Sequence, residues 1–524
     1  MTSGDTTTRG AALHLTPGAL DLAALERFWR APGPVTLDPA AWPGVNAAAE
    51  TVARIVKAGE RVYGINTGFG KLANTAIDAS QVGELQRRLV LSHCAGVGPA
   101  LSHRVVRLTL LLKVNALARG HSGARRQVID ALLEMLNADL LPVIPAQGSV
   151  GASGDLAPLA HLSAVLIGEG EVWDGETRIA ASDALHRLGL APFELAAKEG
   201  LALLNGTQVS TALALDALFA GLDLYAAAVA SGAMSVDAAL GSDVPFDPRI
   251  NALRGQPGQS LVADAFRRLL ADSEIRASHL DCDRVQDPYS LRCQPQVMGA
   301  ALDLLDHAAR TLVREANAVT DNPLVFPDDG EILSGGNFHA EPVAFAADTM
   351  AIALCEIGAL AERRVALLTD ANMSSLPPFL VAEPGLNSGF MIAHVTAAAL
   401  ASENKILAHP ASVDSLPTSA NQEDHVSMST HGARRLAPIL ANAGRIVAIE
   451  LLAAAQGLDL RKPLKSSPLL QGMVAKLRDD VAFRDDDRDV SGDIEHAYRL
   501  VASGWLSDQV WGGADRIPII HQPL

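Results

Sequence analysis

The sequence predicts a mainly α-helical protein, with a core bundle of long helices and a smaller N-terminal domain that is mixed but mostly helical. Long stretches are dominated by Ala and Leu, which are strong helix formers. Within them, apolar residues recur every three or four positions, the spacing that places them on one face of a helix. Aromatic residues make up only 4% of the chain. The helices must therefore pack through small side chains that let their backbones approach closely.

The expected helices follow one another along most of the chain. The clearest pattern covers residues 301–316, where Leu305 and Leu312 lie on the apolar face and Asp306 and Arg310 on the opposite face. The same spacing predicts helices over residues 85–94, 105–118, 127–141, 211–240, 343–368, 391–407 and 436–452. An apolar run at 156–167 follows a glycine-rich loop and indicates one more.

Glycine- and proline-marked loops separate these helices, and the chain has no internal repeat. The charge-dense stretch RDDVAFRDDDRD at 478–489 is typical of a solvated connection. We therefore expect four regions. They are a disordered tail (1–10), an N-terminal domain with the main glycine-rich loops (11–204), a central long-helix bundle (205–480) and a C-terminal helical segment (481–524).

Composition excludes several classes of partner. The chain has 42 Lys and Arg against 59 Asp and Glu, a net charge of −17, which opposes binding to nucleic acids and anionic membranes. The longest stretch without these four residue types, 384–402, contains Pro, Gly, Asn and His, so we expect no membrane span. The polar first ten residues do not have the pattern of a secretory signal. Four widely spaced cysteines indicate neither disulfides nor a zinc knuckle. We expect a cytoplasmic protein.

The loop GSVGASGD at 148–155 allows two interpretations. In the simpler one, Asp155 caps the following helix and the glycines cradle an anion. A phosphate is disfavoured there, because Asp-Leu-Ala follows the last glycine where a phosphate loop has Lys and Ser or Thr. In the other, the unhindered nitrogen of Gly154 attacks the carbonyl carbon of Ala152 while Ser153 loses its hydroxyl as water. The second interpretation makes the tripeptide an electrophile.

A resemblance to a known family covers nearly the whole chain. The stretch GSVGASGDLAPLAHL at 148–162 closely resembles the signature of the histidine and aromatic amino-acid ammonia-lyase family. Further matches, in the family's order and with comparable spacing, are YGINTGFG, LVLSHCAG, KEGLALLNGTQ, QDPYSLRCQPQ, TDNPLVF, GGNFHAEP and SANQEDHVSM. Members of this family cyclise Ala-Ser-Gly into a methylidene-imidazolone. The resemblance thus implies that Ala152, Ser153 and Gly154 form this prosthetic group and that no external cofactor is needed.

The family's reaction needs an electrophile and a base, since an amine is a poor leaving group and a substrate β-proton is weakly acidic. By resemblance Tyr63 is the base, in a mobile loop that could act as a lid. A phenol of ordinary pKa about 10 must then be shifted down to act near neutrality. The resemblance also places Tyr289 in the catalytic group. A tyrosine beside a glycine is, in the simpler interpretation, a packed turn residue.

Four further residues are implied to bind substrate. The planar fork of Arg292 suits a substrate carboxylate, although Arg292 could instead be a surface residue paired with Asp287. Asn205 would hydrogen-bond the prosthetic group or the substrate amine, or else end a helix in an Asn-Gly turn. Gln286 belongs to the same motif as Arg292. Phe338 would form an aromatic wall of the pocket, or simply belong to the core.

Two polar residues, His93 and Glu423, indicate the substrate. A carboxylate and an imidazole could fix the two nitrogens of a substrate imidazole, whereas a phenyl ring would leave both groups unpaired at a cost of roughly 1 to 3 kcal/mol each. Family members acting on phenylalanine typically have an uncharged residue in place of Glu423. We therefore expect deamination of L-histidine to trans-urocanate and ammonia, the first step of histidine degradation. Otherwise His93 is a satisfied helix histidine and Glu423 a solvent-facing charge.

The alternatives that stay open are a tyrosine or phenylalanine ammonia-lyase, an aminomutase, and a catalytically silent helical protein. His339 and Glu341 do not form an HExxH pattern, so we expect no metal site. The family is homotetrameric with active sites built from several chains. We therefore expect a tetramer in which Tyr63, Arg292 and Glu423 need not come from the chain whose Ser153 they serve.

Overall fold

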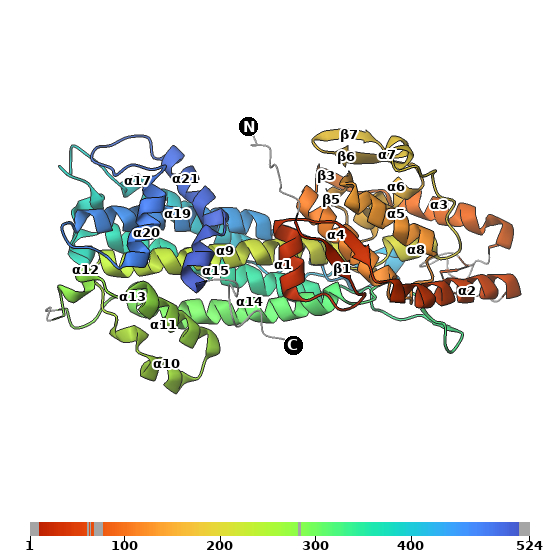
Figure 1. The fold of residues 1–524 in the computed structure, drawn as a ribbon, viewed down its shortest axis with the longest axis horizontal. Coiled ribbons are helices and arrows are strands. Elements are labelled where there is room, and N and C mark those ends of the chain that lie inside the picture. Colours follow the sequence, from red (N-terminus) through yellow and green to blue (C-terminus); the bar gives the residue numbers. More distant parts are fainter. Residues whose placement is uncertain are drawn as a thin grey trace. The chain divides into compact units, whose positions relative to one another are not determined.

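The computed structural model describes residues 10–512 apart from 60–61, 63, 66, 68–76 and 281–283. The predicted mainly α-helical fold is confirmed, because the strands are short and few beside the helices (Figure 1). The chain forms two compact units, each assembled from three separate segments. The first unit contains residues 1–216, 309–348 and 410–434, and the second contains 217–308, 349–409 and 435–524.

The first unit consists of short helices with small sheets. Its helices are α1 (Leu22–Arg30), α2 (Trp42–Ala58), α3 (Val82–His93), α4 (His103–Leu117), α5 (Arg126–Asn137), α6 (Leu156–Leu166), α7 (Ala181–Arg187), α8 (Glu199–Leu204) and α18 (Ser429–Arg434). Its strands are β1 (Leu13–Leu15), β2 (Val35–Leu37), β3 (Val97–Ala100), β4 (Leu140–Pro142), β5 (Pro145–Gln147), β6 (Glu171–Asp174), β7 (Thr177–Ala180), β8 (Leu324–Phe326) and β9 (Glu331–Leu333). They pair as β1-β2 (parallel), and as β3-β5, β4-β6-β7 and β8-β9 (antiparallel).

Three helices of the first unit pack against one another and bring their ends together. Helices α3, α6 and α8 are in mutual contact. Helix α3 ends at His93, α6 begins directly after Asp155, and α8 ends beside Asn205. Because a helix terminus leaves backbone groups unpaired, three such ends in one place need many polar partners. These ends carry predicted site residues.

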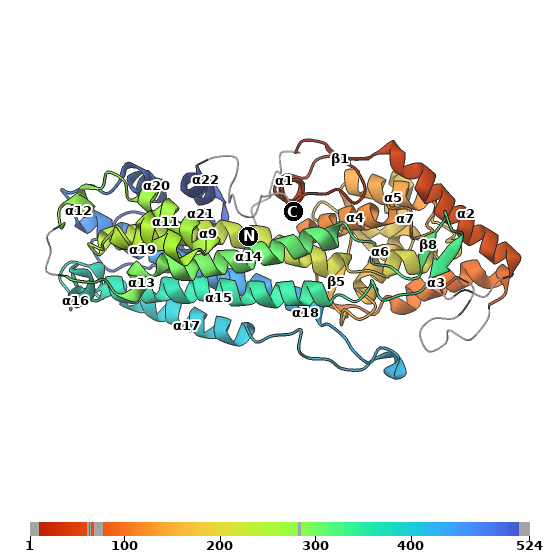
Figure 2. The same cartoon turned by 90° about the horizontal axis from the view of Figure 1, so that it is seen from below.

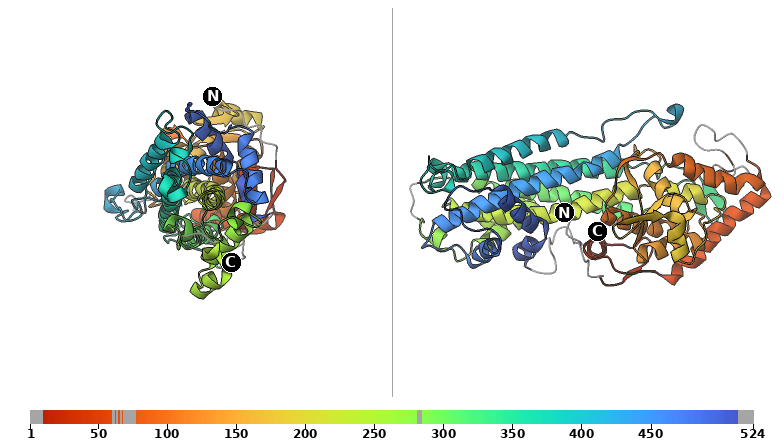
Figure 3. Two further views of the ribbon diagram at one scale, coloured as in Figure 1. Left: turned by 90° about the vertical axis from the view of Figure 1, so that its left-hand side faces the viewer. Right: turned by 90° about the horizontal axis from the view of Figure 1, so that it is seen from above.

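The second unit is a bundle of long helices. Most of α9 (Gln208–Ala238), α14 (Gln294–Ala316) and α15 (Glu341–Thr369) belongs to it, with α17 (Met391–Leu407) and α19 (Leu436–Leu460). Figure 2 and the right-hand view of Figure 3 show these helices extended along one another. The shorter helices are α10 (Pro248–Arg254), α11 (Pro257–Leu269), α12 (Glu274–Ala277), α13 (Tyr289–Arg292), α16 (Ala371–Ser374), α20 (Pro468–Arg478), α21 (Ser491–Ala502) and α22 (Trp505–Trp511).

The bundle packs through small side chains, as predicted from the few aromatic residues. A Cβ added at Gly358 of α15 would lie 3.4 Å from the Cβ of Ala443 of α19. One added at Gly457 of α19 would lie 3.0 Å from the Cβ of Ala238 of α9. Larger residues at these glycines would force the helices apart, because interiors are close-packed.

Within the described part of the chain, three helices are by length and composition alone long and apolar enough to cross a membrane: Gln208–Ala238, Glu341–Thr369 and Ser429–Leu460. Their apolar windows have mean hydropathies of 1.7, 1.7 and 1.6. However, 83%, 67% and 67% of these windows are buried inside the protein. A helix that is apolar on all sides is expected in the core of a large protein as well as in a membrane.

Two predicted helices end earlier than expected. The helix expected over 127–141 stops at Asn137, because Asp139 has a left-handed φ of 58° and Leu140–Pro142 pairs as β4 with β6. The helix expected over 211–240 stops at Ala238, and Leu240 has a φ of 53°. An L-residue with positive φ cannot continue a right-handed helix. The first ending has no adjacent glycine or proline in the sequence, whereas at the second Gly241 directly follows Leu240.

Candidate functional site

The loop with the Ala152-Ser153-Gly154 tripeptide is fixed by segments distant in sequence. It leaves β5, which pairs with β3, and enters α6. The Ser427 hydroxyl donates to the Gly151 carbonyl at 2.9 Å, and the Met428 amide donates to the Val150 carbonyl at 2.8 Å. The Ala340 amide also donates to the Gly151 carbonyl at 3.2 Å. The loop is therefore rigid only once residues near 340 and 427 have folded onto it.

Gly154 lies directly against Gly206. The Asp155 amide donates to the Gly206 carbonyl at 2.7 Å, and a Cβ at Gly154 would lie 2.1 Å from that same oxygen. Gly154 has a φ of +69°, which L side chains rarely adopt. Next to this contact, the Asn205 side-chain amide donates to the Ser153 carbonyl at 2.6 Å. Only glycine fits at position 154, and Asn205 polarises the central carbonyl of the tripeptide.

Asp155 occupies the N-cap position of α6, but its carboxylate makes no capping hydrogen bond, contrary to the simpler interpretation of the loop. Instead it accepts hydrogen bonds from the amide and hydroxyl of Ser210 at 2.8 and 3.0 Å, from Thr430 at 2.6 Å and from Ser149 at 3.0 Å. Burial raises the pKa of Asp155, and these hydrogen bonds oppose the rise. Asp155 thus ties the tripeptide loop to α9 and α18.

A fully buried lysine supports the same turn from behind. The Lys113 ammonium of α4 donates to the carbonyls of Asn205 at 2.9 Å and Ala202 at 3.3 Å, which belong to the C-terminal end of α8. Burial lowers the pKa of Lys113 to about 7, although Asp321 and Asp155 favour its charged form. A cation at a helix C-terminus is favourable, because the last carbonyls carry partial negative charge.

Glu423 contacts the tripeptide within the same chain. Its Oε1 accepts a hydrogen bond from the Ser153 hydroxyl at 2.8 Å, and its Oε2 accepts from Thr418 at 2.7 Å and Ser419 at 2.9 Å. Burial raises the pKa of Glu423, but the three hydroxyl donors and the nearby His93 outweigh it, so the pKa is lowered overall. Glu423 is therefore an ionised carboxylate, and another chain is not needed to supply it.

The loop before Glu423 is strained. Ser419, Ala420 and Asn421 have φ values of 51°, 54° and 64°. Three successive non-glycine residues in the left-handed region cost about 1 kcal/mol or more each. Such strain is stored mainly at functional positions, where surrounding contacts fix the conformation.

His93 lies at the end of α3, on the same side of the unit as Glu423, whose pKa it helps to lower. Its Nδ1 lies 2.8 Å from the Leu89 carbonyl oxygen, which can only accept. In neutral His93 this contact places the proton on Nδ1 and leaves a lone pair on Nε2. The first unit thus brings the His93 imidazole near the Glu423 carboxylate, which itself contacts the tripeptide.

The other predicted site residues make no hydrogen bond to the tripeptide within the described part of this chain. Tyr63 lies outside the described residues. Phe338 lies in the first unit, partly buried, just before α15. Gln286, Tyr289 and Arg292 lie in the second unit. There the Arg292 guanidinium stacks over the Tyr289 ring, 4.6 Å from its centroid, and donates to the Asp287 backbone carbonyl at 3.0 Å.

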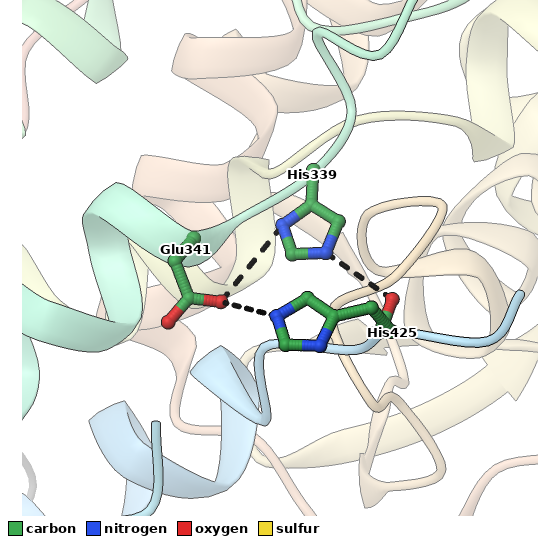
Figure 4. A group of neighbouring side chains, drawn as sticks. All are labelled: His339, Glu341 and His425. Atoms are coloured by element: carbon green, nitrogen blue, oxygen red, sulfur yellow. Dashed lines mark hydrogen bonds and ion pairs between the residues drawn. The ribbon is translucent and has the colours of Figure 1, made fainter. Parts of the chain in front are cut away.

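Sequence reasoning missed one cluster. His339, Glu341 and His425 place one nitrogen or oxygen each within 4.8 Å of one another (Figure 4). His425 comes from the loop before α18, 86 residues after His339. Local spacing such as HExxH could not reveal this group, because it forms only through folding. The only sequence signal is that both histidines stand in motifs that also contain site residues.

A separate cavity of about 700 Å³ lies in the first unit. Trp29, Arg104, Arg107 and Asp216 are among its lining residues, and none of the predicted site residues lines it. Because no predicted site residue lines this cavity, the tripeptide stays the candidate site.

The fold and the tripeptide site together define a helical lyase. The family model described as aromatic amino acid lyase matches residues 20–479. The chain belongs to this family and is an enzyme.

Its relatives include several histidine ammonia-lyases. The histidine ammonia-lyase of Burkholderia pseudomallei (strain 668) is 63% identical over 489 residues, which cover 93% of this chain and 96% of the relative. The crystal structure of histidine ammonia-lyase from Trypanosoma cruzi is 40% identical, with a TM-score of 0.88 over 96% of this chain and 95% of that one. The tyrosine aminomutase from Streptomyces globisporus is 34% identical, with a TM-score of 0.90 over 96% and 99%.

Proposed function

We propose that this enzyme removes ammonia from L-histidine and releases trans-urocanate. The observation that carries the proposal is the ionised Glu423 at 2.8 Å from Ser153, with His93 nearby. It is supported by the 63% identity to a histidine ammonia-lyase over most of both chains. The reaction breaks two covalent bonds, the one between the α-carbon and the amine nitrogen and one between the β-carbon and a hydrogen atom. It forms a double bond between the α- and β-carbons.

We propose that Ala152, Ser153 and Gly154 cyclise to a methylidene-imidazolone, and the surrounding residues fit this group. Gly154 has no side chain to obstruct its nitrogen, Asn205 donates to the Ser153 carbonyl, and the loop is held from both sides. Once formed, the group supplies the electrophile that the departure of an amine requires. The described contacts belong to the peptide before cyclisation.

The substrate imidazole is proposed to lie against Glu423 and His93. Cyclisation removes the Ser153 hydroxyl, and with it the donor that Glu423 Oε1 has in the uncyclised chain. Oε1 can then accept from an imidazole N–H, while Thr418 and Ser419 keep Oε2 in place. A phenyl ring would leave this carboxylate without a partner at a cost of roughly 1 to 3 kcal/mol.

Residues from other parts of the chain complete the proposed site. Arg292 would bind the substrate carboxylate, with Gln286 beside it, and Phe338 would cover the pocket. Tyr63 is proposed to take the β-proton, and Tyr289 to assist it.

We propose a homotetramer in which Tyr63 and Arg292 serve the Ser153 of another chain. Exposed apolar side chains on the bundle support self-association. Ile352 of α15 is 51% exposed, and Ile392 and Val395 of α17 are 61% and 56% exposed. We further propose a cytoplasmic enzyme, which is supported by the free thiols of Cys94, Cys293 and Cys355.

A second candidate function is an aminomutase, which adds ammonia back to the acrylate product. It is favoured by the similarity to a tyrosine aminomutase, with a TM-score of 0.90. The lower sequence identity, 34% against 63%, ranks it behind the lyase. The two functions share a site and differ in their products.

The deciding experiment mixes the purified protein with L-histidine, L-phenylalanine or L-tyrosine and follows the ultraviolet absorbance of the acrylate product. We expect urocanate from histidine only, and none from Ser153→Ala. Intact mass should show the wild-type chain lighter than its translated sequence by two water molecules, and Ser153→Ala at full mass. A β-amino acid as product would indicate the aminomutase, and a full-mass wild-type chain without turnover would indicate a silent protein.

A further inference from the structure

Two imidazoles and a carboxylate converge beside the tripeptide loop. His339 Nδ1 lies 4.0 Å and His425 Nε2 lies 3.9 Å from the same oxygen of Glu341, Oε2. Figure 4 shows the three side chains pointing toward one another, with Glu341 at the start of α15, His339 on the segment just before it and His425 on the facing loop. The two rings are stacked, with centroids 5.6 Å apart and planes 6° apart.

The carboxylate oxygen at the centre receives no hydrogen bond from the described part of the chain. Glu341 Oε2 is buried, and among the described residues it has no hydrogen-bond partner. An ion pair with a protonated histidine would bring nitrogen and oxygen to about 2.7–2.9 Å. The observed separations of 3.9 and 4.0 Å are too long for that. A buried carboxylate oxygen without a donor is costly and calls for a cation.

The proton of His339 is placed away from Glu341. Its Nε2 lies 3.2 Å from the backbone carbonyl oxygen of His425, which can only accept, so Nε2 carries the hydrogen. The lone pair of Nδ1 then faces the Glu341 oxygen, which is also an acceptor. In metal sites, a ligating histidine almost always donates its other N–H to a carbonyl or carboxylate in this way.

We propose that His339, Glu341 and His425 bind a divalent transition-metal cation such as Zn²⁺. Two histidines and one carboxylate form a known zinc donor set, and the nitrogen donors disfavour Mg²⁺ and Ca²⁺. Zinc ligands lie about 2.0–2.2 Å from the metal, so the donors must move together by a few tenths of an ångström. The His425 side chain is 68% exposed and has room for the ring rotation that this requires.

The cation would join the two segments that carry Phe338 and Glu423. His339 directly follows Phe338, and His425 comes two residues after Glu423. A metal held by both segments would position these site residues relative to each other without touching the substrate. This metal site is additional to the proposed deamination chemistry, and its metal would fix the two segments that carry Phe338 and Glu423.

Calorimetric titration of the chelator-treated, full-length protein with Zn²⁺ alone tests the proposal. We expect one saturable site per chain and no comparable binding of Mg²⁺. His425→Ala and Glu341→Gln should each weaken Zn²⁺ binding at least tenfold. The matched control is His496→Ala. His496 is an exposed imidazole of α21, with Nδ1 2.7 Å from the Gly492 carbonyl of its own helix, and its removal should leave Zn²⁺ binding unchanged.

Two further measurements separate a metal site from a structural role. Bound Co²⁺ should give visible absorption bands that His425→Ala abolishes, and circular dichroism should show that this variant stays folded. His425→Cys should keep Zn²⁺ affinity within about tenfold, because a thiolate is also a zinc ligand. The proposal is wrong if the wild-type protein shows no saturable Zn²⁺ site, or if folded His425→Ala binds Zn²⁺ as tightly as His496→Ala.

Discussion

Each oxygen of Glu423 has a different set of partners, and this difference suits a residue that must both stay in place and bind a substrate. Thr418 and Ser419 donate to Oε2, whereas Ser153 donates to Oε1. An ionised carboxylate fixed through one oxygen keeps its orientation when the other oxygen changes partner. The strained loop before it supplies the same rigidity from the backbone.

We therefore expect Glu423→Gln to lower kcat/KM for histidine by about 10- to 100-fold, because an amide accepts more weakly than a carboxylate. Its melting temperature should stay within about 5 °C of the wild type. The matched control is Asp424→Asn, which removes a charge from the exposed neighbouring residue. Steady-state kinetics of both variants decide the matter. Equal kinetics of Glu423→Gln and Asp424→Asn would remove Glu423 from the site.

Lys113 makes stability depend on pH. Its pKa is about 7 in the folded protein, below the ordinary value of 10.5, so between these values the unfolded chain binds more protons than the folded one. The free energy of unfolding should then rise with pH in this window by up to about 1.4 kcal/mol per unit relative to Lys113→Met. Below pH 7 the difference in free energy of unfolding between the wild type and Lys113→Met should not change with pH.

Denaturant titrations at pH 6, 7.5 and 9 measure this dependence. Lys476→Met, which changes an exposed lysine of α20, should follow the wild type at every pH. A constant gap between wild type and Lys113→Met from pH 7.5 to 9 would show that Lys113 titrates normally.

Sequence motifs locate some of these residues and not others. The Ala152-Ser153-Gly154 tripeptide, Asn205 and Glu423 all stand in motifs. In the structure Asn205 and Glu423 each hydrogen-bond to Ser153. The roles of Asp155 and Lys113 could not be predicted. Apart from Ser149, six residues before Asp155, the partners named here lie 55 to 275 residues away, and hydroxyls or backbone carbonyls carry no sequence signature.

At the scale of elements, helical periodicity predicts where most helices lie, because one apolar face decides the packing of each helix. The helix expected over 391–407 has these bounds as α17. Periodicity fails where a residue with a left-handed backbone ends the helix, as at Asp139 and Leu240. Tertiary contacts, and not local preference, determine these ends.

A buried ion pair joins the helices of the second unit. Arg364 of α15 and Glu450 of α19 are both fully buried, with Nη2 and Oε2 2.7 Å apart. Ser231 and Ser235 of α9 also donate to Glu450, at 2.8 and 2.7 Å. The pair thus links three long helices through one carboxylate.

Glu450→Gln should destabilise the protein by about 3–5 kcal/mol, because it leaves the Arg364 charge buried and unpaired. The double variant Arg364→Met with Glu450→Leu should lose less, since neither charge of the pair remains buried without its partner. Thermal and denaturant unfolding of the two variants give the comparison. A double variant less stable than Glu450→Gln would show that the pair itself stabilises the bundle.

At the scale of the whole molecule, each compact unit is assembled from three separate segments. Composition and periodicity divide a chain into consecutive regions, such as the expected regions 11–204 and 205–480. The first unit instead continues to Asp216 and includes residues 309–348 and 410–434. Helices α9 and α15 each contribute residues to both units, so no linker of distinct composition marks these boundaries in the sequence.

Shared active sites make a prediction about mixed oligomers. Ser153→Ala and Arg292→Gln should each be inactive, but their co-expression in equal amounts should restore about a quarter of wild-type activity if the two residues come from different chains. Ser153→Ala with Asn205→Ala is the control. Asn205 contacts Ser153 within one chain, so this pair should restore none. Purified hetero-oligomers and urocanate formation provide the measurement. No recovery with Arg292→Gln would place each site in one chain.

The hydrogen bond from Ser427 to Gly151 joins residues 276 positions apart. At roughly 5 to 20 residues per second, a ribosome needs on the order of 15 to 55 s to make the chain between them. During that time the Ala152-Ser153-Gly154 peptide has left the ribosome without the segment that fixes its loop. A reactive electrophile would therefore be delayed until synthesis is nearly finished, and a truncated chain that stops before residue 427 would remain chemically inert.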